Sequence, residues 1–209
     1  MMSQMALPLD WTRTRDSGSG FLVSASNAEA VRHLEHSATW PVRVSVLVGP
    51  PQSGKSLLGR LFAEATGAEI IDTVHDRHDN DLFHAWNRAQ EKQLPLLMIA
   101  NIPPSQWKVE LADLKSRLAA APVVTIFDPD DGLAAALIER LFADRGTRIA
   151  DDLPAYLVPR IERSYANIHQ IVMQLDEAAL AQRKRISVPF ARQFLQDESA
   201  LSLPGFDPL

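Results

Sequence analysis

The sequence predicts an α/β fold in which a parallel sheet with a phosphate-binding loop is followed by a small all-helical domain. Three observations support this prediction. A glycine-rich phosphate-loop motif follows directly on a β-branched apolar run. Strand-like and helix-like segments then alternate as far as about residue 127, and beyond it apolar residues recur only at helical spacing. A chain of 209 residues is long enough for one α/β domain and a smaller second module.

The phosphate-loop motif is Gly49-Pro50-Pro51-Gln52-Ser53-Gly54-Lys55-Ser56, which fits G-x-x-x-x-G-K-[ST]. It follows the strand-like run Val42–Val48 and precedes a helix predicted from Gly54 to about Thr66. Such a loop points backbone N–H groups and the positive end of the helix at phosphates, while Lys55 neutralises phosphate charge and Ser56 ligates Mg²⁺. The sequence therefore predicts a site for ADP or ATP with Mg²⁺. The residues predicted to contact the nucleotide here are Gly49, Pro51, Ser53, Gly54, Lys55, Ser56 and Leu57.

Three further strands and two further helices complete the predicted sheet domain. They follow one another as the strand Ala68–Val74, a helix over about Asp81–Lys92, the strand Leu94–Ala100, a short helix near Leu111–Leu118 and the strand Val123–Phe127. Alternation of buried strands with helices predicts a parallel sheet that is covered on both faces.

The chain divides into four predicted segments. Residues 1–20 lack periodicity and end in Asp16-Ser17-Gly18-Ser19-Gly20, which is typical of a flexible linker. Residues 21–127 form the phosphate-loop domain. Residues 128–197 have apolar positions three and four apart and form a helical lid domain, and residues 198–209 form a loose terminus.

Composition limits the class of protein. With 46% hydrophobic and 22% charged residues the chain is ordinary for a globular protein, and no apolar run approaches the roughly 18 residues needed to cross a membrane. The absence of cysteine excludes disulfides, and with no secretory signal at the start of the chain we expect a cytoplasmic location. A net charge of -5 argues against a large nucleic-acid face, so we expect little direct DNA binding. Arg183-Lys184-Arg185 either contacts a phosphate backbone locally or forms a solvated helix end.

Several residue strings resemble the DnaA-related branch of the AAA+ ATPases. They are Asp113–Leu118 (D-L-x-S-R-L), Leu96–Pro104 (a sensor-1 strand and Pro-Pro turn), Leu82–Arg88 (L-F-x-L-x-N), Arg160–Ser164 (sensor 2) and Arg183–Phe190 (R-K-x-[IL]-[ST]-x-P-[FL]). The resemblance covers about residues 21–196. DnaA itself would continue into a helix-turn-helix DNA-binding domain at that point, so the resemblance is to the Hda-type regulators, which switch off the replication initiator DnaA.

The resemblance implies a catalytic role in trans for Arg117. This residue would be an arginine finger that enters the ATP site of clamp-bound DnaA and promotes hydrolysis to the inactive ADP form. Arginine fingers raise phosphoryl-transfer rates by about 10³–10⁵. The alternative is an exposed arginine on a helix whose apolar residues are Leu114 and Leu118.

The resemblance also implies nucleotide-site roles outside the loop. Asp72 would be the Walker B ligand to Mg²⁺, or a strand-terminal aspartate that enters a turn. Asn101 would be sensor 1, or a turn residue before Ile-Pro-Pro. Arg163 would be sensor 2, or part of a surface salt bridge. Asn27 would lie in the N-terminal box near the adenine, or cap the helix that begins there.

The first residues of the chain resemble a clamp-binding peptide. Gln4-Met5-Ala6-Leu7-Pro8-Leu9 is similar to the Q-x-x-L-P-L peptide with which Hda-type proteins dock on the DNA sliding clamp, the β subunit of DNA polymerase III. Leu7 and Leu9 would enter an apolar pocket, Pro8 would limit the entropy lost on ordering, and Gln4 would offer a donor and an acceptor. The linker to Gly20 would then tether the ATPase module.

Two features depart from the family pattern. The segment between the loop helix and Ala68–Val74 is too short for the usual strand 2 and its helix, so either strand 2 of the AAA+ order 5-1-4-3-2 or the Walker B strand is lost. The helix resemblance at Leu82–Arg88 favours loss of strand 2. Thr73 follows Asp72 where many members carry a second acid, so we expect weak or absent hydrolysis by the chain itself. The stretch His75–Asp79 supplies a substitute base or metal ligands, or is a charged loop.

The function expected from the resemblance is regulation of bacterial replication initiation, with the sliding clamp and DnaA as partners. Two rival classes remain. A small-molecule kinase would use the same phosphate loop, whereas in a nucleotide-independent adaptor the loop would be a relic and only clamp docking would matter. The sequence leaves open whether the chain forms a homodimer and whether ADP or ATP is preferred.

Overall fold

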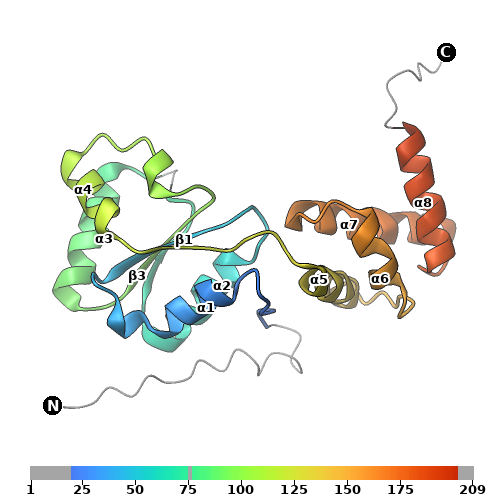
Figure 1. The fold of residues 1–209 in the computed structure, drawn as a ribbon, viewed down its shortest axis with the longest axis horizontal. Helices are drawn as coiled ribbons and strands as arrows, with labels where there is room; N and C mark the ends of the chain where they lie inside the picture. Colours follow the sequence, from blue (N-terminus) through green and yellow to red (C-terminus); the bar gives the residue numbers. More distant parts are fainter. Residues whose placement is uncertain (1–19, 75–76, 202–209) are drawn as a thin grey trace. The chain divides into compact units, whose positions relative to one another are not determined.

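The computed structural model describes residues 20–74 and 77–201, with the side chains of 197–201 excepted. The chain divides after Asp128 into two units, a sheet unit and a helical unit (Figure 1). Among the helices of the described ranges, none is long and apolar enough to cross a membrane.

The sheet unit contains four parallel strands in the order β2-β3-β1-β4. They are β1 (Val44–Val48), β2 (Glu69–Ile71), β3 (Leu96–Ala100) and β4 (Val123–Thr125). Val48 of β1 pairs with Ala100 of β3 and with Thr125 of β4, so three strands end at one edge of the sheet. This edge carries the segments that the sequence singles out.

Helices cover both faces of the sheet (Figure 1). Those of this unit are α1 (Ala28–Glu35), α2 (Lys55–Thr66), α3 (Asp79–Lys92) and α4 (Ala112–Ala120), with 3₁₀ turns η2 (Ser37–Thr39) and η4 (Pro104–Gln106). Alternate strand residues such as Val46 and Met98 pack against α3 and α4. On the other face a Cβ placed on Gly59 of α2 would lie 2.7 Å from Ile99 Cδ1, so glycine there allows α2 to pack closely on the sheet.

The predicted α/β fold with a shortened sheet is confirmed. β2 lies next to β3, where the AAA+ order places the Walker B strand, and no further strand lies beyond β2 among the described residues. The predicted strand Ala68–Val74 is longer than the observed β2, because the chain turns at Asp72 and Thr73, whose φ of 51° is left-handed. β3 begins at Leu96 instead of Leu94 because Pro95 has no N–H to donate to the sheet.

The helical unit consists of four α-helices and one 3₁₀ turn among its described residues. They are α5 (Asp131–Asp144), α6 (Leu153–Leu157), η5 (Val158–Arg160), α7 (Tyr165–Gln182) and α8 (Val188–Leu201). The side chains of Asp130 and Ser164 cap α5 and α7 by accepting hydrogen bonds from backbone N–H groups. α8 continues beyond residue 197, where the sequence predicts the start of a loose terminus. The buried core of this unit is made of Ile138, Phe142, Leu153, Leu157, Ile168, Val172, Leu175, Ile186 and Phe190, among others.

Candidate functional site

The phosphate loop connects β1 to α2 and depends on glycine at two places. Gly54 precedes α2 with a left-handed φ of 83°. A Cβ on Gly49 would lie 3.0 Å from both the Cβ and the carbonyl oxygen of Ile126, beyond the end of the neighbouring strand β4. A side chain at either position would strain or displace the loop. The two glycines of the motif therefore set the path of the loop.

Lys55 is the first residue of α2, and it is buried with 7% of its surface exposed. Its Nζ donates hydrogen bonds to the carbonyl oxygens of Gly49 (2.8 Å) and Pro50 (2.6 Å). Burial lowers the pKa of the Lys55 ammonium, and the carboxylate of Asp72 opposes this shift. A buried ammonium that forms no salt bridge with another described residue is suited to an anion such as a phosphate.

The first turn of α2 has free backbone donors. The N–H groups of residues 54–57 donate no hydrogen bond to another described residue. This is the usual condition of a helix N-terminus, where the unpaired N–H groups and the helix dipole favour an anion. Ser53 is buried within the loop, whereas Pro51 and Ser56 are exposed and Leu57 is half-buried. The donor set fits the phosphates of a nucleotide.

Ser56 and Asp72 lie together although 16 positions separate them in the sequence. The Ser56 hydroxyl donates to Asp72 Oδ2 at 2.5 Å, and the Thr73 backbone N–H donates to Asp72 Oδ1 at 2.8 Å. Asp72 thus enters a turn and also reaches the hydroxyl predicted to ligate Mg²⁺. Hydroxyl and carboxylate oxygens are suitable ligands for this ion. The geometry agrees with the interpretation that β2 is the Walker B strand.

The described residues of the loop that follows β2 form no metal site. Asp79 Oδ2 accepts hydrogen bonds from the backbone N–H groups of Glu110 (2.7 Å) and Leu111 (2.9 Å), so this carboxylate joins the start of α3 to the segment before α4. His75 and Asp76 lie outside the described residues. Within the described ranges, no group of three or more His, Asp or Glu side chains is placed to hold a metal ion.

Asn27 is buried and holds the segment before α1 in place. Its Nδ2 donates to the carbonyl oxygen of Leu22 (2.8 Å) and its Oδ1 accepts from the N–H of Ser24 (2.9 Å). Asn27 occupies the N-cap position of α1, but its side chain makes no capping hydrogen bond. In the same segment the ring of Phe21 lies against Gly54, since a Cβ there would be 3.0 Å from Phe21 Cε2. The predicted adenine-binding segment thus contacts the phosphate loop.

Asn101 is exposed directly after β3. Because Ala100 pairs with Val48, the residue that follows β3 emerges next to the start of the phosphate loop at Gly49. The sequence prediction that Asn101 lies near the phosphates therefore agrees with the strand register. Its side chain makes no hydrogen bond to another described residue.

Arg117 of α4 is half-buried against α3. Its Nη1 donates to Asn87 Oδ1 at 2.5 Å, and its guanidinium carbon lies 4.5 Å from the centre of the Phe83 ring. Phe83 and Asn87 are four residues apart and so share one face of α3. We call these two residues the cradle of Arg117. The sequence singles out both strings but does not reveal that they meet, because their contact depends on how α3 packs against α4.

Arg163 lies before α7 in the helical unit. Its Nη1 forms an ion pair with Asp131 Oδ1 at 2.5 Å, and the two side chains are 58% and 71% exposed. The surface salt bridge that the sequence offers as an alternative is therefore present. Exposed pairs of this kind are worth about 0.2–1 kcal/mol, so Arg163 can exchange this partner at little cost.

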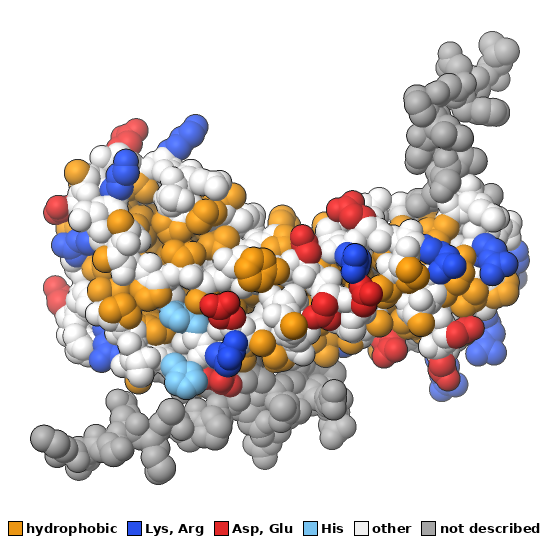
Figure 2. Space-filling model, in the orientation of Figure 1, with side chains coloured by type: hydrophobic (Ala, Val, Ile, Leu, Met, Phe, Trp, Pro, Cys, Tyr) orange, Lys and Arg blue, Asp and Glu red, His pale blue; other side chains and the backbone are white. Residues whose placement is uncertain are grey.

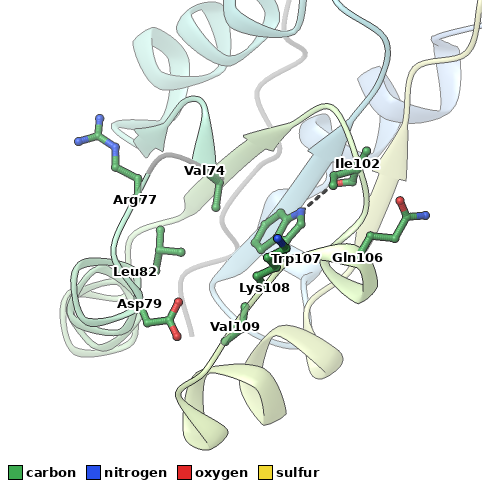
Figure 3. Close-up of a pocket in the computed structure, with 9 residues that line it drawn as sticks. All are labelled: Val74, Arg77, Asp79, Leu82, Ile102, Gln106, Trp107, Lys108 and Val109. Atoms are coloured by element: carbon green, nitrogen blue, oxygen red, sulfur yellow. Dashed lines mark hydrogen bonds between the residues drawn. The ribbon is translucent and has the colours of Figure 1, made fainter.

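A hollow of about 260 Å³ lies between the start of α3 and the segment that follows β3 (Figure 3). Trp107 forms one wall, and its indole N–H donates to the carbonyl oxygen of Ile102 at 2.8 Å. The lining of the hollow includes Arg77 and Lys108, but none of the phosphate-loop residues. Of the candidate site residues, Arg77 and Asp79 from the stretch His75–Asp79 line this hollow, whereas the predicted nucleotide-site residues do not. The predicted clamp-binding residues Gln4, Leu7, Pro8 and Leu9 lie outside the described residues.

The sheet order, the phosphate loop and the helical second unit define an AAA+ fold, and comparison with solved structures agrees. Domain III of the replication initiation protein DnaA from Thermotoga maritima has a TM-score of 0.68 and 13% identity over 85% of this chain and 94% of that one. AMPPCP-bound DnaA from Aquifex aeolicus has a TM-score of 0.56 and 15% identity over 75% of this chain and 62% of that one. At such low identity these likenesses concern the fold.

The helical unit shows which kind of AAA+ protein this chain resembles. Residues 130–195 match the family model described as the lid domain of Hda. The resemblance to the Hda-type, DnaA-related AAA+ proteins that the sequence motifs indicate is thereby confirmed. An uncharacterized protein of Haemophilus influenzae is 25% identical over 122 residues, which are 58% of this chain. That match spans about half, 53%, of the relative's own length.

Proposed function

We propose that this chain is a nucleotide-binding regulator of replication initiation that docks on the DNA sliding clamp and supplies Arg117 to the ATP site of DnaA. The Hda lid match and the DnaA-like fold support the class of regulator. The observation that carries the finger is the cradle, which orients the guanidinium while Arg117 as a residue stays half-buried. A finger acts on another molecule, so it must be fixed by its own chain and still be accessible.

The phosphate loop would hold ADP or ATP within this chain. Its backbone N–H groups and Lys55 would bind the phosphates, and Ser56 with Asp72 would complete the Mg²⁺ shell, as their 2.5 Å contact supports. Asn101 would approach the terminal phosphate. The phosphate oxygens of a bound nucleotide would accept hydrogen bonds from the N–H groups at the start of α2, which have no other acceptor among the described residues. Thr73 provides no carboxylate to activate water, so the nucleotide would fix the conformation and not serve as fuel.

Arg163 would be the residue through which the lid senses nucleotide. Its ion pair with Asp131 is exposed and weak, and a triphosphate would be a stronger partner for a guanidinium. Exchange of Asp131 for phosphate would then make the ion pairing of Arg163 depend on bound nucleotide. Asn27 would act indirectly, since its amide is engaged by Leu22 and Ser24 and shapes the segment beside the adenine.

Arg117 would supply the chemistry in trans. A guanidinium has a fixed charge and a planar set of donors, which stabilise the charge that develops on the transferred phosphoryl group. The Phe83 ring and the Asn87 amide restrict the rotamers of this long side chain, so less conformational entropy is lost when DnaA binds. The tail motif Gln4–Leu9 would place the chain at the clamp by docking Leu7 and Leu9.

The proposed function is tested by adding this protein to ATP-bound DnaA together with clamp loaded on DNA. Hydrolysis should accelerate only when both the protein and the loaded clamp are present. Deletion of residues 1–10 should abolish clamp binding in a pull-down and also the stimulation of ATP hydrolysis by DnaA. The variant Leu7→Ala/Leu9→Ala should lose both activities as well, without shortening the chain. Unchanged stimulation by the deletion variant, or transfer of phosphate from ATP to a small acceptor, would contradict the proposal.

A further inference from the structure

A cationic hollow of about 550 Å³ lies in the helical unit, and Arg163, the predicted nucleotide residue of that unit, does not line it. Four basic side chains line it, from two segments that are distant in the sequence. Arg148 follows α5, whereas Arg183, Lys184 and Arg185 follow α7. A parallel bridge between Ile149 and Ile186 joins the two segments and fixes the basic residues around one hollow. We call these four residues the lid basic cluster.

Among the described residues of the helical unit, no side chain neutralises the charges of the lid basic cluster. All four side chains are exposed, and none forms a salt bridge or side-chain hydrogen bond with another described residue. The single carboxylate of the lining, Asp176, accepts from Thr147 Oγ1 at 2.7 Å and lies 3.6 Å from Arg145 Nε. The hollow therefore holds four cations against one acid that is already engaged. On a chain of net charge -5 this is a marked local reversal of sign.

A solvated helix end does not account for the whole cluster. Basic residues after α7 complement the negative end of that helix, and the left-handed Arg183, with φ of 52°, closes it. Arg148 belongs to a different segment, however, and lies beyond the end of α5. Its convergence on the same hollow indicates a shared anionic partner.

We propose that the lid basic cluster binds the phosphodiester backbone of duplex DNA. Three of its four residues are arginines, whose planar donors match phosphate oxygens, and exposed cations around an open hollow suit a repeated anionic backbone. The total charge excludes a large nucleic-acid face but permits a contact with about three phosphates. The inference rests on the proposed function only for the source of the duplex, since a clamp-docked chain is held beside the DNA that the clamp encircles. Tethering of this kind makes a weak contact effective.

The test measures anisotropy of a labelled 20-base-pair duplex titrated with full-length protein, without clamp or DnaA, as the salt concentration is raised. Lys184→Gln/Arg185→Gln leaves the left-handed Arg183 intact. It should weaken binding about tenfold at low salt and reduce the slope of log affinity against log salt by about two, one unit for each phosphate contact. The control Arg160→Gln/Arg192→Gln removes the same charge from the same unit, where both arginines lie over Tyr156, and should leave the slope unchanged. Arg148→Gln should reduce the slope by about one.

The design separates the alternatives. An unchanged slope of log affinity against log salt for Arg148→Gln would mean that Arg148 contacts no phosphate. The basic residues after α7 would then serve only the end of that helix, and the proposal would be overturned. Equal losses in the control variant would mean general electrostatics and would overturn it too. Polyglutamate or phosphatidylglycerol vesicles that bind as tightly as the duplex would assign the cluster to a protein or membrane surface instead. Failure of clamp binding with intact duplex binding would refute the proposed function and leave this site in place.

Discussion

The cationic side chains with proposed functions have different surroundings in the two units. In the sheet unit, Lys55 and Arg117 are each held by atoms of the same unit: three loop oxygens around Lys55, and the cradle around Arg117. In the helical unit, Arg163 has one exposed acidic partner, and the lid basic cluster has none among the described residues. The sheet unit therefore fixes the positions of its cationic side chains, whereas those of the helical unit can exchange one partner for another. Substitutions in the two units should therefore have effects of different size.

Replacement of Lys55 should have the largest effect on this chain's own ligand binding. Lys55→Ala removes the buried ammonium from the phosphate loop, and we expect nucleotide affinity to fall by about 100-fold or more, equivalent to about 2.7 kcal/mol. Titration with a fluorescent ADP analogue measures it. The control Arg60→Ala removes an exposed charge from the same helix and should bind normally. Retained stimulation of DnaA by Lys55→Ala would favour an adaptor that does not need nucleotide.

The cradle should affect the rate and not the binding of DnaA. Asn87→Ala removes the hydrogen bond that orients Arg117, and the loss of about 1 kcal/mol of positioning energy corresponds to a fall of about fivefold in the maximal stimulated hydrolysis rate. The concentration of the chain that gives half-maximal stimulation should not move. Phe83→Leu should act in the same direction by removing the ring under the guanidinium. If both variants stimulate normally, the cradle has no positioning role.

Much of this architecture could be predicted from the sequence, and the exceptions have physical reasons. The strands β1 and β3 are runs of five buried residues, and they lie where their apolar pattern predicts. β2 is shorter than its pattern because Asp72 and Thr73 turn the chain. The contact of Ser56 with Asp72, the cradle and the lid basic cluster all join segments at least 16 positions apart. Such contacts depend on packing, for which a single sequence has no local signal.

Stability should fall in acid because of a half-buried histidine in the sheet unit. His33 stacks on Trp40 at 4.9 Å, and Nε2 lies 2.8 Å from Ser45 Oγ. Burial lowers the pKa of His33, and the effect of Glu29 in raising it is smaller. In acid the native state then binds fewer protons than the unfolded state. The contribution of neutral His33 to the free energy of unfolding is therefore fully present above about pH 6.5 and is lost as the pH falls through the lowered pKa.

The loss from His33 cannot exceed about 1.4 kcal/mol per pH unit, the limit for one proton. Urea unfolding at several pH values measures it. His33→Gln should be less stable near neutral pH but show a flatter dependence between pH 7 and 5. His169 of the helical unit also has a pKa lowered by burial, with a further contribution from Arg145, so His169→Gln is the matched variant for the lid. An equally steep dependence in His33→Gln would exclude this residue as a source.

The smallest effect is expected at the lid ion pair. Asp131→Asn removes the partner of Arg163, and because both side chains are exposed we expect the free energy of unfolding to change by less than about 1 kcal/mol. Nucleotide affinity should stay the same or rise slightly, since Arg163 no longer has a competing carboxylate. A fall in nucleotide affinity would show that Asp131 itself supports the site and that the pair is not an exchangeable one.

The central claim is that Arg117 acts in the ATP site of another molecule, and a single-turnover measurement tests it most directly. Hydrolysis of ATP bound to DnaA is followed with loaded clamp and a saturating amount of Arg117→Ala, with Lys115→Ala as a control that removes one positive charge from the same helix. The account predicts that Arg117→Ala lowers the stimulated rate by at least about 100-fold, within the range of known fingers, while its own nucleotide affinity and clamp binding stay unchanged. Full stimulation by Arg117→Ala would contradict the account.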